Sequence, residues 1–465
     1  MSAQTEDKSD SPMKSAVLHR HTSFVPKKAV GGKGSYLFLE DGTKFLDSTG
    51  GAAVSCLGHG NEKVNQAITD QLQKISYCHT AFFGTDVSEE LARFLVDSTG
   101  GKFSKLYVVS SGSEAVEAAL KLSRQYFLEL PTPQPQRTRF IARKPSYHGI
   151  TLGALGAGGH VIRREPFEPL LSTNTSHVSP CYAYRGKKDG ESDADYVVRL
   201  ADELDAEFQR VGPETVCAFI AEPVVGAALG CVPAVPGYFP AMKSVCEKYG
   251  ALLILDEVMS GMGRCGTLHA WEQEGIVPDL QTIGKALGGG YAPVSGLLIS
   301  DKIVQAIDKG TGSFRHGQTY QGHPVSCAAA LAVQKVIKEE GLLEKVKSMG
   351  GYLETKLRGT LGDHPHVGDI RGKGLFWGIE FVKDKATKEP FSTETTVALL
   401  IQETGLKPEH GISLYASSGT ADGIRGDHVI LAPPYNVTKE EIDIIVEKTG
   451  EIVKEVFAQV EWGSE

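Results

Sequence analysis

Three separate stretches of the chain carry residue types that could do chemistry together. The first is Ser111-Gly112-Ser113-Glu114, which follows the apolar run LYVVS. Ser111 and Glu114 fit a capping box, so a helix is expected to begin there. A helix N-terminus that follows a strand presents free backbone N–H groups and the positive end of the helix dipole, and both favour a bound anion such as phosphate. A capped helix without a ligand is the simpler explanation of this segment taken alone.

The second stretch places a carboxylate directly after a buried strand. Asp256 follows the apolar residues ALLIL, and Glu257 comes next. Ligands of α/β proteins bind at the carboxyl ends of strands. A carboxylate there can hold the N–H of a pyridinium ring and keep that ring protonated, so that it accepts electrons. The alternative is a carboxylate that caps a helix or lies in a loop.

The third stretch is a lysine between a short apolar strand and a glycine cluster. Lys285 follows Thr282-Ile283-Gly284 and precedes Gly288-Gly289-Gly290. A lysine amine can form an imine with an aldehyde, and partial burial lowers its pKa toward the neutral, nucleophilic form. Taken alone, such a lysine is more often a surface residue beside a flexible loop.

The elements that must position these residues alternate between strand and helix. This alternation predicts an α/β fold with a mostly parallel sheet covered by helices on both faces. The expected strands are Leu106–Val109, Phe140–Ala142, Val216–Ala221, Leu252–Leu255 and Gly296–Ile299, and the expected helices are Ser113–Leu130 and Phe239–Tyr249. Near the N-terminus, Leu37–Asp47 predicts a hairpin with Asp41-Gly42 as its turn.

The chain is expected to form two structured domains. After about residue 325 the pattern changes, with a helix expected at Val325–Glu340 and a strand at Gly374–Val382. We interpret the order as a disordered tail, an N-terminal segment that joins the small domain, a large domain and a small C-terminal domain, at residues 1–13, 14–70, 71–324 and 325–465.

Composition argues against several classes of function. The 465 residues carry a formal net charge of −9, which disfavours general nucleic-acid binding. The eight cysteines form no CxxC pair, which favours free thiols in a reducing compartment. The sequence shows no run of eighteen apolar residues and no signal peptide, so we expect a cytoplasmic protein that does not bind membranes. The histidines lack paired ligand spacing, and no metal is expected.

Seven motifs, taken in their order, point to one known family. They are SSGSEAVEAALK (110–121), YHG (147–149), AEPV (221–224), LDEVMSGMGRCG (255–266), GKALGGG (284–290), HGQTYQGHP (316–324) and RGKGLFWGIEF (371–381). With these motifs the chain resembles the class III aminotransferases, also called ω-aminotransferases, of the fold-type I superfamily that uses pyridoxal 5′-phosphate (PLP). The resemblance runs from about residue 20 to the C-terminus. It implies a large α/β domain with a mostly parallel seven-stranded sheet and a smaller α+β domain.

The resemblance also implies a PLP site and a homodimer. Gly112 and Ser113 would bind the cofactor phosphate through their backbone, while Tyr147 and Val258 would pack on opposite faces of the pyridine ring. Thr319 would reach the phosphate of the neighbouring subunit's cofactor, which requires a homodimer.

The catalytic groups follow from the same resemblance. Asp256 would pair with the ring nitrogen, Lys285 would hold PLP as a Schiff base, and Glu222 would orient substrate or an arginine. The freed amine of Lys285 would act first as a general base and then as a general acid. The expected reaction moves an amino group from an amine or amino acid donor to a keto acid or aldehyde acceptor, with ping-pong kinetics.

The substrate region departs from well-known members of the family. Ile150 follows the Tyr-His-Gly motif where ornithine-type relatives have a carboxylate-binding arginine, and Ile430 precedes Ala-Pro-Pro where many relatives have another. Because the arginine fork is not easily replaced, this counts against a diacid or an α-amino acid bound in the ornithine-type way. Arg425 and Arg371 are then the candidates for binding a substrate carboxylate. Phe83 and Leu57 are candidates for an apolar wall, although such residues more often pack in a core.

Three other classes of function are open to the sequence. One is a non-catalytic binding role, against which Lys285 argues because a binding module would not need an imine. Racemases, aminomutases and decarboxylases of this fold keep the same lysine and aspartate, because fold does not settle chemistry. A dehydrogenase is a weaker alternative, since GMGRCG (261–266) follows a strand and outlines a dinucleotide-binding loop. Asp256 and Glu257 would place two negative charges beside the pyrophosphate, which counts against NAD.

Overall fold

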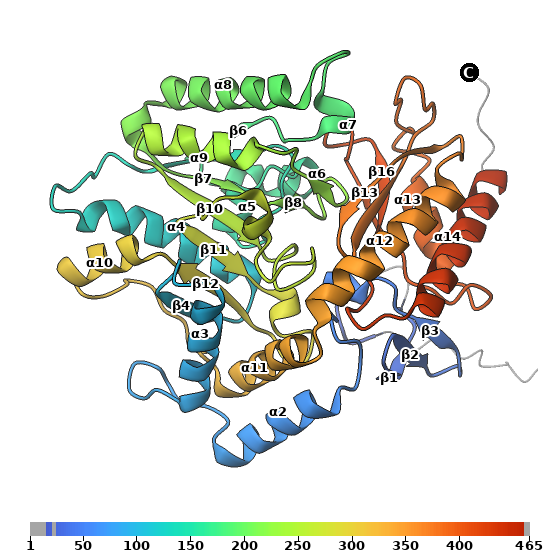
Figure 1. The fold of residues 1–465 in the computed structure, drawn as a ribbon, viewed down its shortest axis with the longest axis horizontal. Coiled ribbons are helices and arrows are strands. Elements are labelled where there is room, and N and C mark those ends of the chain that lie inside the picture. The colour runs from blue at the N-terminus through green and yellow to red at the C-terminus, as the bar shows by residue number, and fades with distance from the viewer. Residues whose placement is uncertain (1–14, 21–24, 460–465) are drawn as a thin grey trace, which may run out of the picture.

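The computed structural model describes residues 15–20 and 25–459, so the tail expected at residues 1–13 lies outside the described residues. Figure 1 shows a large part on the left, which carries the central sheet, beside a smaller part on the right. The N-terminal strands lie below the smaller part in this view.

The large part is built on a seven-stranded sheet in the order β4-β12-β11-β10-β7-β5-β6. Its strands are β4 (Lys105–Val109), β5 (Arg139–Arg143), β6 (Thr175–Val178), β7 (Val216–Ala221), β10 (Leu252–Glu257), β11 (Leu280–Ile283) and β12 (Ser295–Ile299). β12 runs antiparallel to both of its neighbours, and the other pairings are parallel. The expected mostly parallel seven-stranded α/β sheet is therefore confirmed.

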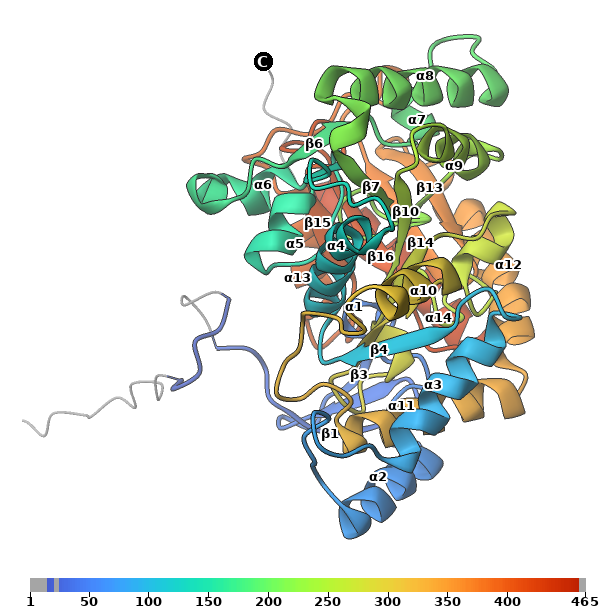
Figure 2. The ribbon, with the colours of Figure 1, turned by 90° about the vertical axis from the view of Figure 1, so that its left-hand side faces the viewer.

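Helices surround this sheet (Figures 1 and 2). They are α1 (Gly50–Ala53), α2 (Glu62–Lys74), α3 (Asp86–Ser98), α4 (Gly112–Glu129), α5 (Leu152–Ala157), α6 (Val161–Arg164), α7 (Ala183–Gly186), α8 (Asp193–Val211), α9 (Tyr238–Lys248), α10 (Asp301–Lys309) and α11 (Pro324–Glu339). α2 and α11 pack against each other at one edge of the large part, where Figure 2 shows them together. Among the described residues, none of the helices has the length and apolarity needed to span a membrane.

Both faces of the central sheet are buried, which explains why its strands are nearly continuous apolar runs. Along β10, Leu252 and Ile254 belong to the core that includes Val116 of α4. Leu253 and Leu255, which point to the opposite face, belong to the core that includes Phe239 of α9. The end of β10, and the carboxylate that it carries, is thus held from both sides.

Most elements expected from the sequence are present with small differences at their ends. The five expected strands of the central sheet match β4, β5, β7, β10 and β12, and the expected helices match α4, α9 and α11, each end shifted by at most two residues. The predicted hairpin is formed by β2 (Tyr36–Leu39) and β3 (Lys44–Leu46), with Gly42 of the turn at a φ of 85°. The sequence did not predict β6, because its residues TSHV include one aliphatic side chain.

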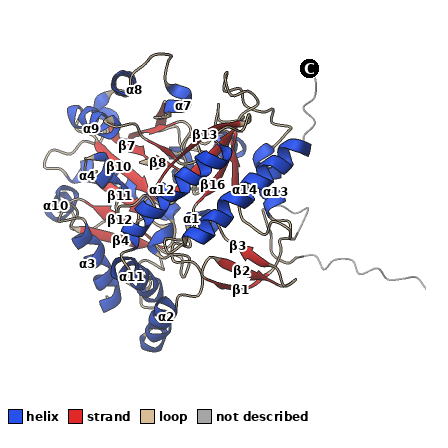
Figure 3. Cartoon of the chain, turned by 45° about the vertical axis from the view of Figure 1, so that its right-hand side comes forward, coloured by secondary structure: helices blue, strands red, loops and turns tan. Residues whose placement is uncertain are grey.

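The smaller part contains a four-stranded antiparallel sheet in the order β13-β14-β16-β15. The remaining elements are β1 (Ala29–Lys33), β8 (Val224–Val225), β9 (Val232–Pro233), α12 (Leu342–Leu361), β13 (Val367–Lys373), β14 (Phe376–Phe381), α13 (Val397–Gly405), β15 (Tyr415–Ser418), β16 (Asp427–Leu431) and α14 (Lys439–Gln459). Figure 3 shows α12, α13 and α14 beside this sheet. The N-terminal hairpin contacts the same part, because the N–H of Leu46 donates to the carbonyl of Gly411 at 2.8 Å.

A buried ionic cluster joins the smaller sheet to the large part. Glu380 on β14 is fully buried, and its carboxylate lies 2.6 Å from Arg371 on β13 and 2.6 Å from Arg185 of α7. The hydroxyl of Tyr182 donates to the same carboxylate. Since Arg185 and Tyr182 belong to the large part, this carboxylate links the two parts across their boundary.

Removing the carboxylate at the centre of this cluster should destabilise the protein strongly. Glu380→Ala leaves Arg371 buried without its closest acidic partner, so we expect a loss of about 3–5 kcal/mol in the free energy of unfolding, measured by denaturant titration. Glu354→Ala, which removes an exposed partner of Arg358, is the matched control and should change it by less than about 0.5 kcal/mol. Equal losses in the free energy of unfolding would contradict the prediction that the buried cluster stabilises the protein more than the exposed pair does.

Candidate active site

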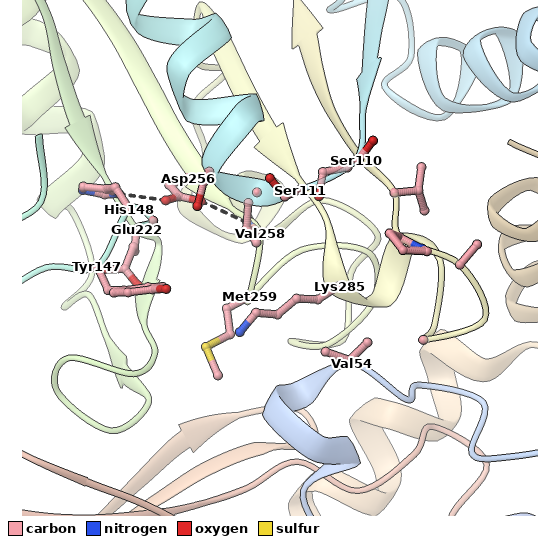
Figure 4. Close-up of a pocket in the computed structure, with 18 residues that line it drawn as sticks. Val54, Ser110, Ser111, Tyr147, His148, Glu222, Asp256, Val258, Met259 and Lys285 are labelled. Carbon is pink, nitrogen blue, oxygen red and sulfur yellow. Dashed lines mark hydrogen bonds and ion pairs between the residues drawn. The ribbon is translucent and has the colours of Figure 1, made fainter. Parts of the chain in front are cut away.

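A cavity of about 420 Å³ lies at the edge of the central sheet where the parallel strands end (Figure 4). Its polar residues lie at the ends of five strands: Ser110 follows β4, Tyr147 follows β5, Glu222 follows β7, Asp256 is the penultimate residue of β10 and Lys285 follows β11. The lining is completed by Val54, Ser111, Gly112, Ser113, His148, Gly149, Val258, Met259, Gly290, Ala292, Pro293, Val294 and Ser295. The three stretches that the sequence suggested for chemistry therefore meet in one cavity, as expected for the carboxyl edge of an α/β sheet.

The N-terminus of α4 forms one wall of the cavity. Ser111 and Glu114 form the predicted capping box, in which the backbone N–H of Glu114 donates to Ser111 Oγ at 3.2 Å and the N–H of Ser111 donates back to Glu114 Oε2 at 2.9 Å. Within the described residues, the backbone N–H groups of Gly112 and Ser113 make no hydrogen bond. A Cβ at Gly112 would lie 2.8 Å from Val258 Cγ1, so only glycine fits there. The result is a pair of free donors at the positive end of a helix dipole.

A buried carboxylate is fixed at the end of β10. One oxygen of Asp256 lies 2.7 Å from His148 Nδ1, and the other accepts from Thr282 Oγ1 at 2.9 Å and from the backbone N–H of Val258 at 3.1 Å. Figure 4 shows His148 and Asp256 joined in this way on one side of the cavity. These partners set the orientation of the carboxylate, because both of its oxygens are engaged on the protein side.

His148 is a functional residue that sequence reasoning did not single out. Its side chain is buried, and in the described structure its Nε2 atom has no hydrogen-bond partner. The available signal was its place in the Tyr147-His148-Gly149 motif, but its partner Asp256 is 108 residues away in the sequence. Only the packing of β5 near β10, with β7 between them, brings the two side chains together.

Lys285 has an unusual backbone and an unusual amine. Its φ is 44°, in the left-handed region that a non-glycine residue adopts at a cost. Loss of hydration lowers the pKa of its amine to about 8, although the negative charges of Glu222 and Asp256 act in the opposite direction. Figure 4 shows its side chain extending along the cavity toward Met259. A neutral, nucleophilic amine is therefore available near neutral pH.

Glu222 holds the backbone around the cavity. It is 4% exposed, and its carboxylate accepts the backbone N–H of Tyr147 at 3.0 Å and of Gly226 at 3.1 Å. Burial is the main cause that raises the pKa of this carboxyl group. Glu222 therefore positions Tyr147, whose ring also lines the cavity, and the backbone carbonyl of Glu222 accepts a hydrogen bond from the side chain of Arg143.

Three other predicted site residues lie outside this cavity. Leu57 is 2% exposed and packs in the main hydrophobic core. Phe83 is 67% exposed and lines a separate surface hollow beside α2 and α11. Thr319 is exposed, and its carbonyl accepts the hydroxyl of Tyr77 at 2.9 Å. The apolar wall that was expected from Leu57 and Phe83 is instead supplied by Val54, Val258, Met259, Ala292 and Pro293.

The two arginines proposed for a substrate carboxylate are already engaged. Arg371 is buried outside the cavity, where it pairs with Glu380 and Asp369 and donates to the carbonyls of Leu229 and Gly230. The guanidinium of Arg371 thus makes its contacts with these groups and lies outside the cavity, where the sequence had suggested a contact with substrate. Arg425 also lies outside this cavity and pairs with Asp422 at 2.8 Å.

The glycine-rich segment that outlined a dinucleotide site has a structural role. Residues 258–265 form turns rather than the helix that such a site needs. Arg264 within it is buried and donates to the carbonyls of Leu375 and Pro433. The segment therefore connects the large part to the smaller one.

Together, the fold and the cavity define a transaminase of the PLP-dependent kind. The chain belongs to the class III aminotransferase family, which matches residues 16–453. It is 53% identical over 429 residues to an aminotransferase of Gibberella zeae, covering 92% of this chain and 84% of that protein. It is 35% identical to gamma aminobutyrate transaminase 3 of Solanum lycopersicum, covering 92% of this chain and 81% of that protein. A solved structure of an omega transaminase from Pseudomonas jessenii in complex with PMP superposes with a TM-score of 0.87 at 31% identity, covering 94% of each chain.

These comparisons confirm the family, the fold and the enzyme class that the sequence predicted. Class III aminotransferases depend on PLP. The aminotransferase interpretation is thus confirmed, and the racemase, aminomutase, decarboxylase and dehydrogenase alternatives are set aside.

The lowered pKa of Lys285 predicts pH-dependent labelling of this residue. In protein freed of cofactor, we expect the rate of acylation of Lys285 to rise through about pH 8 and then level off, because its amine becomes neutral there. Solvent-exposed lysines should continue to gain reactivity up to about pH 10 or above. Mass spectrometry of the labelled peptides separates the two behaviours, and a Lys285 profile that coincides with that of exposed lysines would contradict the prediction.

Proposed function

We propose that the cavity holds PLP and that the protein moves amino groups between amines and carbonyl compounds by a ping-pong mechanism. The observation that carries this proposal is the convergence of an anion cradle, a fixed carboxylate and a lysine amine of lowered pKa in one cavity. Its volume of about 420 Å³ is in the range of small-molecule sites. These are the three groups that a phosphorylated pyridine aldehyde requires.

The residues fit the cofactor in chemistry as well as in volume. The free backbone donors of Gly112 and Ser113 suit a phosphate at the helix N-terminus. Asp256 suits a protonated ring nitrogen, since both of its oxygens are already oriented by the protein. Val258 and Tyr147 line the cavity as apolar and aromatic surfaces against which a flat ring can pack.

Each catalytic side chain then has one task. When bound, PLP supplies an aldehyde that exchanges between amines and a ring that accepts electrons. Asp256 holds the ring nitrogen protonated, and His148 keeps Asp256 in place. Lys285 would hold the aldehyde of the cofactor, and its freed Nζ would take a proton from the substrate carbon as a general base and then give that proton up again as a general acid. The surrounding protein reduces the access of water, which lowers the pKa of this amine to about 8.

We further propose that the protein acts as a homodimer in which Thr319 contacts the cofactor phosphate of the partner subunit. Thr319 is exposed on the loop after α10 and lies outside its own chain's cavity. Its surroundings are unusually apolar for a surface, since Phe82, Phe83 and Tyr320 are 75%, 67% and 57% exposed. Exposed aromatic groups of this kind mark a protein–protein contact, which supports the dimer.

Absorbance spectroscopy of the purified protein tests the central proposal. With PLP supplied, wild-type protein should show a band near the visible edge that shifts when an amine is added without a keto acid. Lys285→Ala should lower the rate of this shift by about 10²–10⁴-fold, because the proton-transferring amine is gone. Lys102→Ala, which alters an exposed lysine before β4, is the control and should behave as wild type. The absence of any band in wild-type protein would refute the proposal.

Removal of the Thr319 hydroxyl tests the shared site. Thr319→Ala should weaken the affinity for PLP about tenfold or more, because one hydrogen bond to a charged phosphate is lost. Thr319→Ser keeps the hydroxyl and should keep the affinity, which can be measured by equilibrium dialysis. Unchanged affinity in a dimeric Thr319→Ala protein would rule out the contact across the interface.

A further inference from the structure

A buried glutamine binds the backbone of the turn that carries Lys285. Gln334 lies on α11 and is 1% exposed. Its Nε2 atom donates to the carbonyl oxygen of Ala286 at 3.0 Å and to that of Leu287 at 2.9 Å. These two residues directly follow Lys285, whereas Gln334 lies 48 and 47 residues further along the chain. One side chain therefore fixes two successive peptide groups beside the reactive lysine.

The turn does not satisfy these two oxygens by itself. Lys285–Leu287 is a single turn of 3₁₀ helix, in which the carbonyl of Lys285 accepts two backbone N–H groups of the glycine cluster that follows. In the described part of the chain, no backbone N–H donates to the carbonyl of Ala286 or Leu287. Both residues are buried, and a buried carbonyl without a partner is unfavourable. Gln334 supplies the missing donors.

The amide of Gln334 is oriented by these two carbonyl groups. Its Oε1 atom is buried and has no hydrogen-bond partner among the described residues. A buried acceptor without a donor is unfavourable, so the side chain would gain from an orientation that paired this oxygen. The opposite orientation of the amide would instead place the oxygen against the two carbonyl oxygens and remove both hydrogen bonds. The contacts with the turn therefore outweigh the unpaired oxygen.

The backbone that Gln334 binds is strained. Lys285 has a φ of 44°, and a non-glycine residue keeps such a conformation only where its surroundings fix it. On its N-terminal side Gly284 is closely packed, because a Cβ there would lie 2.5 Å from Ser295 Oγ. On its C-terminal side the hydrogen bonds of Gln334 restrain the chain. The strained residue is thus held on both sides, and its side chain extends into the catalytic cavity (Figure 4).

We infer that Gln334 is a positioning residue for the reaction, because it holds the backbone of Lys285 in the conformation from which the amine reaches the catalytic cavity. Gln334 does not line that cavity, so it acts through the lysine. A displacement of a reacting group by about 1 Å can lower a rate about 10²-fold, and without Gln334 the strained turn is free to relax. This inference rests on the proposed function, but the position of the amine can be tested without it.

Removal of the two amide donors tests the inference in the holoenzyme. Gln334→Met keeps a similar volume and should lower the maximal rate at which an added amine shifts the absorbance band about 10–100-fold. The amine concentration that gives half of this rate should stay within about twofold of wild type, because no residue of the cavity wall is changed. Gln334→Asn keeps an amide that is too short to reach the turn, so it should show the same loss of rate. Gln71→Met is the matched control and should behave as wild type, since Gln71 is a buried glutamine whose amide donates to a carbonyl away from the cavity, that of Ile75 at 2.9 Å.

The affinity for PLP separates an action through Lys285 from a general role in shaping the cavity. In the wild-type background, Gln334→Met should weaken the binding of PLP about tenfold, because the amine that holds the aldehyde is displaced. In the Lys285→Ala background the same change should leave the affinity within about twofold, since no amine remains to be positioned. Equilibrium dialysis measures both affinities, and equal losses in the two backgrounds would overturn the inference.

Labelling of the cofactor-free protein makes the test independent of the reaction. Gln334→Met should raise the midpoint for acylation of Lys285 from about pH 8 toward that of exposed lysines, because an amine released from its buried position regains hydration. The charged groups that face this amine are unchanged by the substitution, namely Glu222, Asp256, Arg264 and Arg163.

Two results would overturn the role of Gln334. One is a wild-type labelling profile in Gln334→Met, and the other is a wild-type rate in both Gln334→Met and Gln334→Asn. Failure of the wild-type protein to show an absorbance band with PLP would refute the proposed function instead, while the labelling profiles would still decide whether Gln334 positions Lys285.

Discussion

The rest of the site depends on one electrostatic balance, in which the amine of Lys285 loses hydration beside the two carboxylates Asp256 and Glu222. Burial favours the neutral amine, and the carboxylates favour the charged one. The described structure contains no ion pair between Lys285 and either acid, because Asp256 is held by His148 and Thr282, and Glu222 by backbone N–H groups. The two acids are therefore close enough to raise the pKa of the amine, but their hydrogen bonds to other groups hold them in place. The ends of the strands thus fix the positions of two acidic side chains and one amine.

Prediction from sequence succeeded where the signal is local. The capping box at Ser111, the strand end that carries Asp256 and the glycine cluster after Lys285 each lie within a few residues, and the apolar runs around them specify the sheet. It failed where a side chain forms its hydrogen bonds and ion pairs with residues that are distant in the sequence. The fate of Arg371 is decided by carbonyls 141 and 142 residues away and by the neighbouring strand, and no short motif contains that information.

The left-handed backbone at Lys285 also bears on how this enzyme can change over time. A residue held at a φ of 44° and deprived of water stores free energy that the rest of the fold must offset. Loss of the lysine, above all to glycine, would relieve both burdens at once. A duplicated copy freed from selection for activity would therefore gain stability by its first inactivating substitution, so that inactive descendants should persist as well-folded proteins rather than disappear through misfolding.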